Sequence, residues 1–353
     1  MPHGRYLITG ATGFAGGHIA EACIPRGVQV VTLARGSSDT ALLTKLGVEI
    51  VRGDLTDTAA IRKAAEGADV VVHCAAKVGD WGPVEEYRQI NVEGTRRLLE
   101  AVRGTPLKRF VHLSSLGVYE ARDHFGTDET VPPPDRHMDG YTQTKVESEK
   151  LVLETHRKER TPVVVLRPGF IYGPRDRTVL PRLLDNLRHK RVRYLGSGEQ
   201  AMNTIYVGNL VDAVFLAIDR PDAVGQIYNL TDDELVSKRR FLDSIADLAG
   251  LERPQRAVPL RVAKIAAWLM ENIARLRGAK QAPRLTQARL KFLGLNLGFS
   301  VEKAKRELGY QPRVKFQDGI QKALSWWKAH QAATSPPLAS HAPQASAVRG
   351  QTH

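Results

Sequence analysis

The residues of this chain that are best suited to proton transfer are a tyrosine and a lysine one helical turn apart. Tyr141 and Lys145 belong to the stretch YTQTK, and their i, i+4 spacing puts both side chains on one helix face. An ammonium about 4 Å from a phenolate stabilises the ionised form of the phenol by about 4 kcal/mol at an effective dielectric of roughly 20. That free energy would lower the tyrosine pKa from about 10 to near neutrality, so that the phenol could exchange a proton with a substrate oxygen. A solvated helix face is the alternative interpretation.

A pair of serines and a glycine-rich loop each directly follow an apolar run. Ser114 and Ser115 follow the run 109–113, where they either reach a ligand or form a turn. Gly10, Gly13 and Gly16 follow the run 6–8 and open a helical pattern, within TGATGFAGGHIA. Glycines at this spacing permit a tight turn, close approach of the backbone to a diphosphate and close helix packing. The loop therefore predicts dinucleotide binding.

The elements that must position these residues alternate along the first half of the chain. Apolar runs at 6–8, 28–33, 48–51, 69–74, 109–113 and 163–167 predict strands. Helical patterns lie at 40–46, 59–66, 85–103 and 141–160. The alternation predicts an α/β fold, a doubly wound parallel-sheet Rossmann fold with ligands at the carboxyl ends of its strands.

The second half predicts a smaller, mainly helical C-terminal substrate lobe. Residues 1–174 are expected to form the Rossmann domain and 175–330 the lobe, with 203–232 returning to the sheet. Helices are expected at 175–190 and 237–249, and the Ala/Ser/Pro-rich tail 331–353 is expected to be disordered.

The net charge of +13 is concentrated near the C-terminus. Residues 251–330 hold 17 Lys and Arg against 5 Asp and Glu, which suggests either an anionic partner or a solvated basic face. Neither a membrane-spanning run nor a signal segment is found, so a cytoplasmic location is expected. No metal site and no nucleic-acid partner are expected.

Taken together, the glycine loop, the SSxxVY segment and the YxxxK helix resemble extended short-chain dehydrogenase/reductases over residues 5–329. The segments HCAAKVGDWG, NVEGT, LRPGFIYGP and GYQP…W extend the resemblance. It is closest to the 3-beta-hydroxysteroid dehydrogenase/isomerase branch, which includes bacterial 2-alkyl-3-oxoalkanoate reductases. The resemblance implies Tyr141 as general acid/base, Lys145 on the cofactor ribose, Ser115 on the substrate oxygen and Asn91 in support. It also implies a homodimer through the helices 85–103 and 141–160.

An NADP cofactor is favoured over NAD at the end of the second strand. An NAD enzyme would carry an acidic residue there, whereas this chain has Ala34 followed by Arg35, which can pair with a 2′-phosphate. Asp54 follows the third strand, where it could meet the adenine edge, and the alternative is a capping role for Asp54 or Asp57. The predicted cofactor-binding residues are Gly10, Thr12, Gly13, Phe14, Ala15, Gly16, Arg35, Asp54, Leu55, Ala75, Ala76, Tyr141, Lys145, Pro168 and Gly169.

An apolar substrate is suggested by two departures from nucleotide-sugar enzymes of the superfamily. Phe170 stands where they commonly have Asn, and Met202 where they commonly have a phosphate-clamping Arg. Both residues could instead be core, with the clamp supplied by Arg175 or Arg284. Trp81 either walls the same pocket or packs. The helix 259–278 is basic and amphipathic, so it either contacts a membrane peripherally or packs on the lobe.

The sequence thus predicts an NAD(P)-dependent oxidoreductase that interconverts a secondary alcohol and a ketone on a hydrophobic, sterol-like or long-chain beta-hydroxy/beta-keto substrate. A nucleotide-sugar epimerase or dehydratase is one alternative. A non-catalytic dinucleotide sensor is the other.

Overall fold

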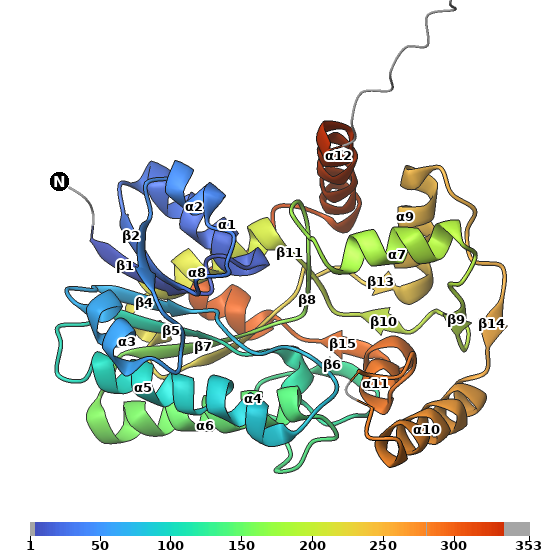
Figure 1. Cartoon of the computed structure of the whole chain (residues 1–353), viewed down its shortest axis with the longest axis horizontal. Coiled ribbons are helices and arrows are strands. Elements are labelled where there is room, and N and C mark those ends of the chain that lie inside the picture. Colours follow the sequence, from blue (N-terminus) through green and yellow to red (C-terminus); the bar gives the residue numbers. More distant parts are fainter. Residues whose placement is uncertain (1–3, 280, 335–353) are drawn as a thin grey trace, which may run out of the picture.

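A seven-stranded parallel sheet forms the centre of the protein, whose computed structural model describes residues 4–279 and 281–334 (Figure 1). The strand order is β12-β7-β5-β4-β1-β2-β3. The strands are β1 (Arg5–Thr9), β2 (Gln29–Ala34), β3 (Glu49–Arg52), β4 (Val70–His73), β5 (Arg109–Leu113), β7 (Val163–Pro168) and β12 (Ile227–Leu230). Their nearly continuous apolar runs suit strands that are covered on both faces. The predicted doubly wound Rossmann fold is confirmed.

The strand order reverses between β1 and β4, which pair in parallel with Thr9 opposite His73. The chain proceeds outward from β1 through β2 and β3 on one side, and through β4, β5 and β7 on the other. Crevices at such reversal points, outside the carboxyl ends of the strands, are where open α/β sheets bind ligands. The glycine loop after β1 lies at this point.

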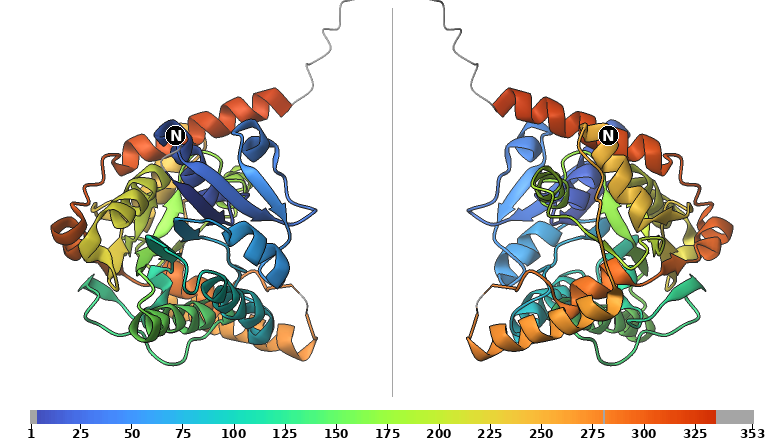
Figure 2. Two further views of the ribbon diagram at one scale, coloured as in Figure 1. Left: turned by 90° about the vertical axis from the view of Figure 1, so that its left-hand side faces the viewer. Right: turned by 90° about the vertical axis from the view of Figure 1, so that its right-hand side faces the viewer.

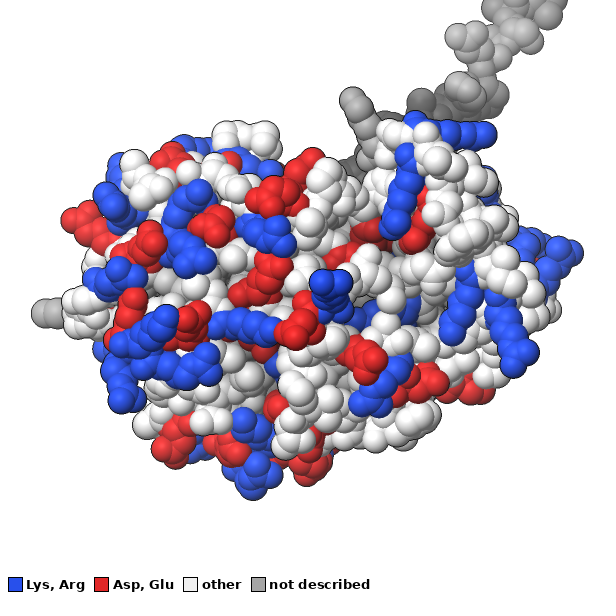
Figure 3. Space-filling model, turned by 90° about the horizontal axis from the view of Figure 1, so that it is seen from below, with Lys and Arg blue, Asp and Glu red and all other residues white. Residues whose placement is uncertain are grey.

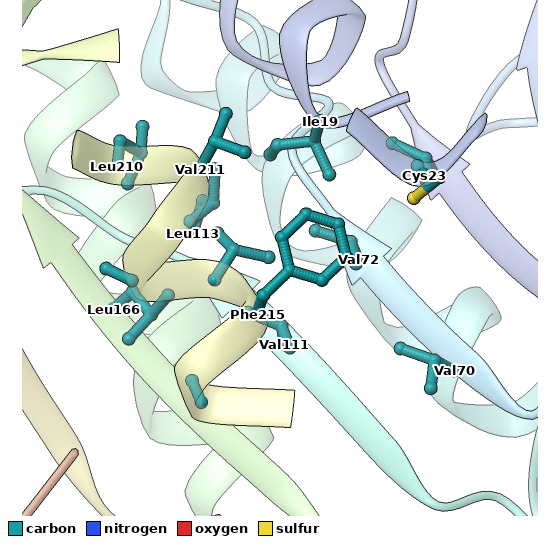
Figure 4. Packing of buried hydrophobic residues seen from close by; sticks show 14 of the residues in the cluster. Ile19, Cys23, Val70, Val72, Val111, Leu113, Leu166, Leu210, Val211 and Phe215 are labelled. Atoms are coloured by element: carbon teal, nitrogen blue, oxygen red, sulfur yellow. The ribbon is translucent and has the colours of Figure 1, made fainter. Parts of the chain in front are cut away.

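Helices cover both faces of the sheet (Figure 1). One face carries α1 (Phe14–Cys23), α2 (Ala41–Lys45) and α8 (Val207–Asp219). The other carries α3 (Thr58–Ala65), α4 (Val84–Asn91), α5 (Glu93–Ala101) and α6 (Gly140–Glu159). Figure 4 shows Phe215 of α8 between Ile19 of α1 and the strand residues Val72 and Val111, a dry core that fixes α1 over β1.

Two predicted helices differ from the structure. The helix predicted at 85–103 is interrupted at Val92 and forms α4 and α5. The helix predicted at 175–190 begins only at Val179, as α7 (Val179–Arg188). Its start is fixed by Asp176, whose side chain accepts hydrogen bonds from the backbone N–H groups of Thr178 and Val179 at 2.8 and 2.9 Å. Side-chain capping of this kind satisfies N–H groups that a helix start leaves unpaired.

The C-terminal lobe is mainly helical. It contains α7, α9 (Lys238–Ala249), α10 (Leu260–Leu276), α11 (Gln287–Gly294) and α12 (Phe316–Thr334). Short strand pairs join β8 (Phe170–Tyr172) to β11 (Thr204–Tyr206), β9 (Tyr194–Leu195) to β14 (Ala257–Val258), β10 (Ala201–Met202) to β13 (Val236–Ser237), and β6 (His124–Thr127) to β15 (Leu297–Phe299). One-turn segments are η1 (Ile24–Arg26), η2 (Leu116–Val118), η3 (Pro221–Ala223) and η4 (Ala304–Leu308).

Helices α12 and α10 lie on opposite sides of the molecule in all three views (Figures 1 and 2). Because α12 continues to Thr334, residues 331–334 are helical, and the rest of the predicted tail, 335–353, lies outside the described residues. Within the two described ranges, no helix combines the length and the hydropathy that crossing a bilayer requires. The domain division at 174/175 stays a prediction.

Candidate active site

Backbone crowding explains the glycines of the loop after β1. Gly10 has a φ of +74°, and a Cβ on it would lie 2.8 Å from the backbone nitrogen of Ala75. A Cβ on Gly16 would lie 2.4 Å from the carbonyl oxygen of Gly10. Gly13 N–H donates to Gly10 O at 2.9 Å and directly precedes α1. The glycine loop therefore leaves the N-terminus of α1, which is the positive end of the helix dipole, accessible at the point where the strand order reverses.

A cavity of about 700 Å³ opens at the carboxyl ends of β1 to β4. Its size falls in the range of small-molecule and cofactor sites. The lining residues are Thr9, Gly10, Thr12, Gly13, Phe14, Ala15, Gly16, Leu33, Ala34, Arg35, Ser38, Gly53, Asp54, Leu55, Cys74, Ala75, Ala76, Lys77, Val78 and Ile90. Of the predicted cofactor-binding residues, all but Tyr141, Lys145, Pro168 and Gly169 line it. The cavity, its glycine cradle and the helix N-terminus fit a dinucleotide.

Asp54 lines this cavity and closes a local turn but does not cap a helix, and its predicted contact with the adenine edge stays a prediction. Its carboxylate accepts hydrogen bonds from Thr56 N–H at 2.8 Å and Thr56 Oγ1 at 2.6 Å. These bonds lower the pKa of Asp54, and the nearby charge of Arg35 lowers it further. Helix α3 is capped by a different residue, Asp57, which accepts from Ala60 N–H at 3.0 Å.

The side chains of Ser115 and Tyr141 lie close enough together for Ser115 to lower the pKa of Tyr141. Ser115 is held at the end of the β5 segment, because its Oγ accepts a hydrogen bond from Gly117 N–H at 3.0 Å. Tyr141 lies in the first turn of α6, which Asp139 caps by accepting from Thr142 N–H at 2.7 Å. The strand-end hydroxyl and the phenol that the sequence singled out therefore converge.

Lys145 lies one turn further along α6, but its ammonium does not set the pKa of Tyr141. Lys145 Nζ donates to Leu113 O at 2.6 Å in a buried setting, and burial lowers the Lys145 pKa to about 8. Burial instead raises the pKa of Tyr141 to about 12, with a further increase from Asp139 and a partial decrease from Ser115. The expected shift of the tyrosine toward neutrality is therefore wrong for this arrangement, since desolvation dominates and the lysine points to a carbonyl.

Asn91 connects the cavity to α6. Its Oδ1 accepts from Lys77 N–H at 2.7 Å, and its Nδ2 donates to Lys77 O at 3.1 Å and to Thr144 Oγ1 at 2.9 Å. Asn91 is buried at the end of α4. It therefore fixes the backbone of a cavity-lining residue to the helix of Tyr141 and Lys145, while its predicted catalytic support stays a prediction.

A buried hydrogen-bond chain that the sequence did not reveal runs from the cavity to Asn91. Ala75 N–H donates to Thr9 Oγ1 at 3.2 Å, and Thr9 Oγ1 lies 2.7 Å from His73 Nδ1. His73 Nε2 lies 2.9 Å from Thr95 Oγ1, whose hydroxyl donates to Asn91 O at 2.6 Å. Since that hydroxyl is committed, His73 must donate from Nε2 and accept at Nδ1. Burial lowers the His73 pKa to about 3 and keeps the ring neutral.

Pro168 and Gly169 join β7 to the lobe at a point where a neighbouring backbone leaves no room for a side chain on Gly169. A Cβ on Gly169 would lie 1.9 Å from Asn203 O, the oxygen that also accepts from Phe170 N–H at 2.7 Å. Only glycine allows the β7–β8 junction to pass this close to the strand region of the lobe. The predicted contact of this pair with the cofactor stays a prediction.

The three predicted substrate residues lie in the lobe or against it. The ring of Phe170 packs on those of Phe241 and Phe292 at centroid distances of 5.7 and 5.3 Å. Met202 is buried in the same lobe core and borders a cavity of about 130 Å³. Trp81 Nε1–H donates to Ala279 O at 2.8 Å. All three pack as the alternative interpretation expects, and contact with substrate stays a prediction.

The lobe contributes two further basic groups that bear on the site. Lys291 of α11 donates from Nζ to Gly117 O at 2.6 Å and to Tyr119 O at 2.7 Å, just after Ser115. Burial lowers its pKa to about 8. No local sequence pattern marks Lys291, because its partners lie far away in the chain. Arg175, offered as a clamp, is paired with Glu21 at 2.7 Å.

These features define an α/β protein whose cavity fits a dinucleotide and whose Ser115 and Tyr141 side chains lie close together, and comparisons with known proteins give the family. Residues 6–231 match the NAD dependent epimerase/dehydratase family. The chain is 34% identical over 318 residues to the 4-hydroxy-2-methyl-3-oxo-4-farnesyl-3,4-dihydroquinoline-1-oxide ketoreductase of Stigmatella aurantiaca, covering 90% of this chain and 94% of the relative. It is 32% identical to the 2-alkyl-3-oxoalkanoate reductase of Stenotrophomonas maltophilia, covering 90% of this chain and 98% of that one.

The fold is similar to that of UDP-glucuronic acid 4-epimerase from Bacillus cereus in complex with NAD. The TM-score is 0.73 at 23% identity, covering 92% of this chain and 99% of that structure. The chain belongs to the NAD dependent epimerase/dehydratase family. It is an extended short-chain dehydrogenase/reductase of the 3-beta-hydroxysteroid dehydrogenase-like branch, as the sequence predicted, and its cofactor is a nicotinamide dinucleotide.

Proposed function

We propose that this enzyme is an NADP-dependent reductase and dehydrogenase that interconverts a ketone and a secondary alcohol on an apolar, sterol-like or long-chain beta-keto substrate. The observation that carries the proposal is the proximity of the Ser115 and Tyr141 side chains, with Lys145 one turn away. Lys145 is close enough to the cavity-lining Cys74 for the two to interact electrostatically. This interaction supports placing the pair near the cofactor cavity.

In the reductive direction the chain has to supply one proton and hold one oxygen. Ser115 donates a hydrogen bond to the carbonyl oxygen, and Tyr141 transfers its phenolic proton to that oxygen. A nicotinamide dinucleotide held by the glycine loop and the residues that line the cavity would supply the hydride for reduction and accept it in oxidation. Because burial keeps the Tyr141 pKa near 12, the phenol is protonated at neutral pH and is ready to act as the acid.

The preference for NADP is supported by the end of β2. Ala34 and Arg35 line the cavity where an acidic residue would repel a 2′-phosphate. Arg52 Nη1 donates to Arg35 O at 3.2 Å, which fixes the backbone that carries the guanidinium. Asp54 is adjacent, so Arg35 also offsets its negative charge.

The apolar substrate is supported by the lobe and by the relatives. Phe170 is surrounded by aromatic rings where nucleotide-sugar enzymes commonly place a polar residue. The relatives named above act on a farnesylated dihydroquinoline oxide and on 2-alkyl-3-oxoalkanoates. Each of these substrates joins a reacting carbonyl to a large apolar body.

The test is Tyr141→Phe, with Tyr6→Phe as the matched control because Tyr6 lies at the opposite end of β1 from the glycine loop. Reduced nicotinamide is followed by absorbance with sterol ketones, long-chain beta-keto acids and nucleotide sugars. Turnover of the preferred ketone should fall at least about a hundredfold in Tyr141→Phe, with NADP affinity unchanged, and should stay unchanged in Tyr6→Phe. Equal turnover in both variants would refute the role of Tyr141. The epimerase or dehydratase alternative regenerates its cofactor in each turnover, so it would be established by conversion of a nucleotide sugar, detected by chromatography, without a net change in reduced nicotinamide. Failure of the wild type on every substrate in both measurements would revive the sensor.

A further inference from the structure

Helix α10 is oriented with its large apolar side chains away from the protein. The residues that it buries are small: Ala263, Ala267 and Ala274. The first two pack with Leu290 of α11. The large apolar residues are exposed, from 46% for Leu269 and Ile273 to 89% for Leu276. The complete exposed set is Val262, Ile265, Trp268, Leu269, Ile273 and Leu276.

This orientation is the reverse of that in an ordinary surface helix, which buries its large apolar stripe against the core. The spacing of Ile265, Leu269, Ile273 and Leu276 places them along one face, and Trp268 extends that face sideways. Monomeric soluble proteins seldom expose so many contiguous large apolar side chains unless another surface covers them. Helix α10 does pack on the lobe, as the alternative interpretation expects, but through its alanines and not through this stripe.

Positive charges border the apolar stripe. Arg261, Lys264 and Arg275, at positions i, i+3 and i+14, lie on one neighbouring face of the helix and are exposed. The single acid of the helix, Glu271, has a side chain only 13% exposed, and it accepts a hydrogen bond from Gln287 N–H at 2.7 Å. Viewed from below, the side of the molecule that carries α10 is largely white, with several blue side chains projecting from it (Figure 3). The exposed face of α10 is thus apolar with a basic border.

We propose that the exposed face of α10 docks the enzyme on a membrane surface that contains anionic lipids. A helix of this kind inserts its apolar stripe at the level of the headgroups, while its basic border meets lipid phosphates. Trp268 lies within the basic row, four residues after Lys264 and seven before Arg275, and tryptophan is enriched at the membrane–water interface. A second copy of the chain is the less favourable occupant, because two such faces would bring like charges together.

The docking helix is tied to the loop that leaves the cofactor cavity. The indole of Trp81 donates to Ala279 O just beyond α10, and Asp80 forms a 2.8 Å ion pair with Arg289 of α11. Lys77 and Val78, a few residues earlier, line the cavity. The segment just beyond α10 is therefore in contact with the loop that follows the cavity-lining residues Lys77 and Val78. The docking proposal does not depend on which substrate the enzyme uses.

The experiment is flotation of the full-length chain with vesicles of phosphatidylcholine, with and without phosphatidylglycerol. The matched pair of variants is Leu276→Ser on α10 and Leu235→Ser between β12 and β13, since both leucines are more than four-fifths exposed, at 89% and 83%. The wild type should float with the anionic vesicles. Leu276→Ser should weaken partitioning about tenfold, whereas Leu235→Ser should leave it unchanged.

A triple variant, Arg261→Gln, Lys264→Gln and Arg275→Gln, tests the basic border. The partitioning of this variant onto anionic vesicles should fall about fivefold for each cation removed. Partitioning of the wild type should also weaken when the salt concentration is raised. Trp268 fluorescence should shift to the blue with anionic vesicles, and the shift should vanish in Trp268→Phe. Three outcomes overturn the proposal: no flotation of the wild type, equal effects of both serine variants, or sedimentation showing that Leu276→Ser dissociates an oligomer in the absence of lipid.

Discussion

A buried ion pair attaches the helix of the proposed proton donor to the sheet. Glu149 of α6 and Arg167 of β7 share two hydrogen bonds, and Arg167 Nε to Glu149 Oε2 measures 3.0 Å. Their side chains are 4% and 2% exposed. Arg167 Nη1 also donates to the hydroxyl of Tyr119 at 2.8 Å. Helix α6 carries Tyr141 and Lys145, so this pair fixes both relative to the strand ends.

Glu149→Gln should therefore lower the free energy of unfolding by about 3 to 5 kcal/mol, the cost of leaving one buried charge without its partner. The amide keeps the size of the carboxylate, so neither a cavity nor overpacking contributes to the loss. Glu154→Gln is the matched control on the same helix. Its partner Lys158 lies 2.6 Å away, but both side chains are at least half exposed, and its removal should have little effect on stability.

Guanidinium chloride unfolding followed by circular dichroism measures both losses. Replacing the pair by apolar residues, Glu149→Leu with Arg167→Met, should recover much of the stability, because no buried charge then remains unpaired. Equal losses in Glu149→Gln and Glu154→Gln would refute this reasoning. So would a double replacement that is less stable than Glu149→Gln.

Three further predictions concern the cofactor site. Gly16→Ala places a Cβ 2.4 Å from the carbonyl oxygen of Gly10 and should raise the Kd for NADP by about tenfold or more. Gly36→Ala, with open space around its Cβ, should leave that Kd unchanged. Calorimetry measures the Kd of both variants. Arg35→Ala should lower kcat/KM with NADPH by about tenfold or more and leave that with NADH nearly unchanged, and equal losses with both cofactors would contradict the proposed preference. Burial lowers the Lys145 pKa from 10.5 to about 8, so the unfolded state binds the extra proton between these values and the wild type gains stability as the pH rises through this window. Lys145→Met should therefore raise the Tm of the cofactor-free protein near neutral pH, and an advantage that does not shrink toward pH 10.5 would contradict the assignment.

The sequence alone was sufficient for the features that depend on local patterns. Continuous apolar runs located the strands of the sheet up to β7, because strands covered on both faces leave little room for polar residues. The glycine loop could be predicted from the sequence because nearby backbone atoms leave no room for a side chain at Gly10 or Gly16. Those atoms belong to residues a few positions away or next to the neighbouring strand. The tyrosine–lysine spacing likewise located helix α6 and the face of that helix which carries Tyr141 and Lys145.

Tertiary structure decided what depends on distant partners. The pKa of Tyr141 rises because burial outweighs any effect of Lys145, whose ammonium points to Leu113 O; spacing along a helix cannot report desolvation. The ring of His73 became part of a hydrogen-bond chain only when β4 was placed against β1 and α5. Helix α10 shows the same limit most clearly. Its periodicity predicted an amphipathic helix, but only packing against α11 showed that alanines face inward and the large apolar side chains face outward, because a sequence gives the faces of a helix and not which of them the rest of the chain covers.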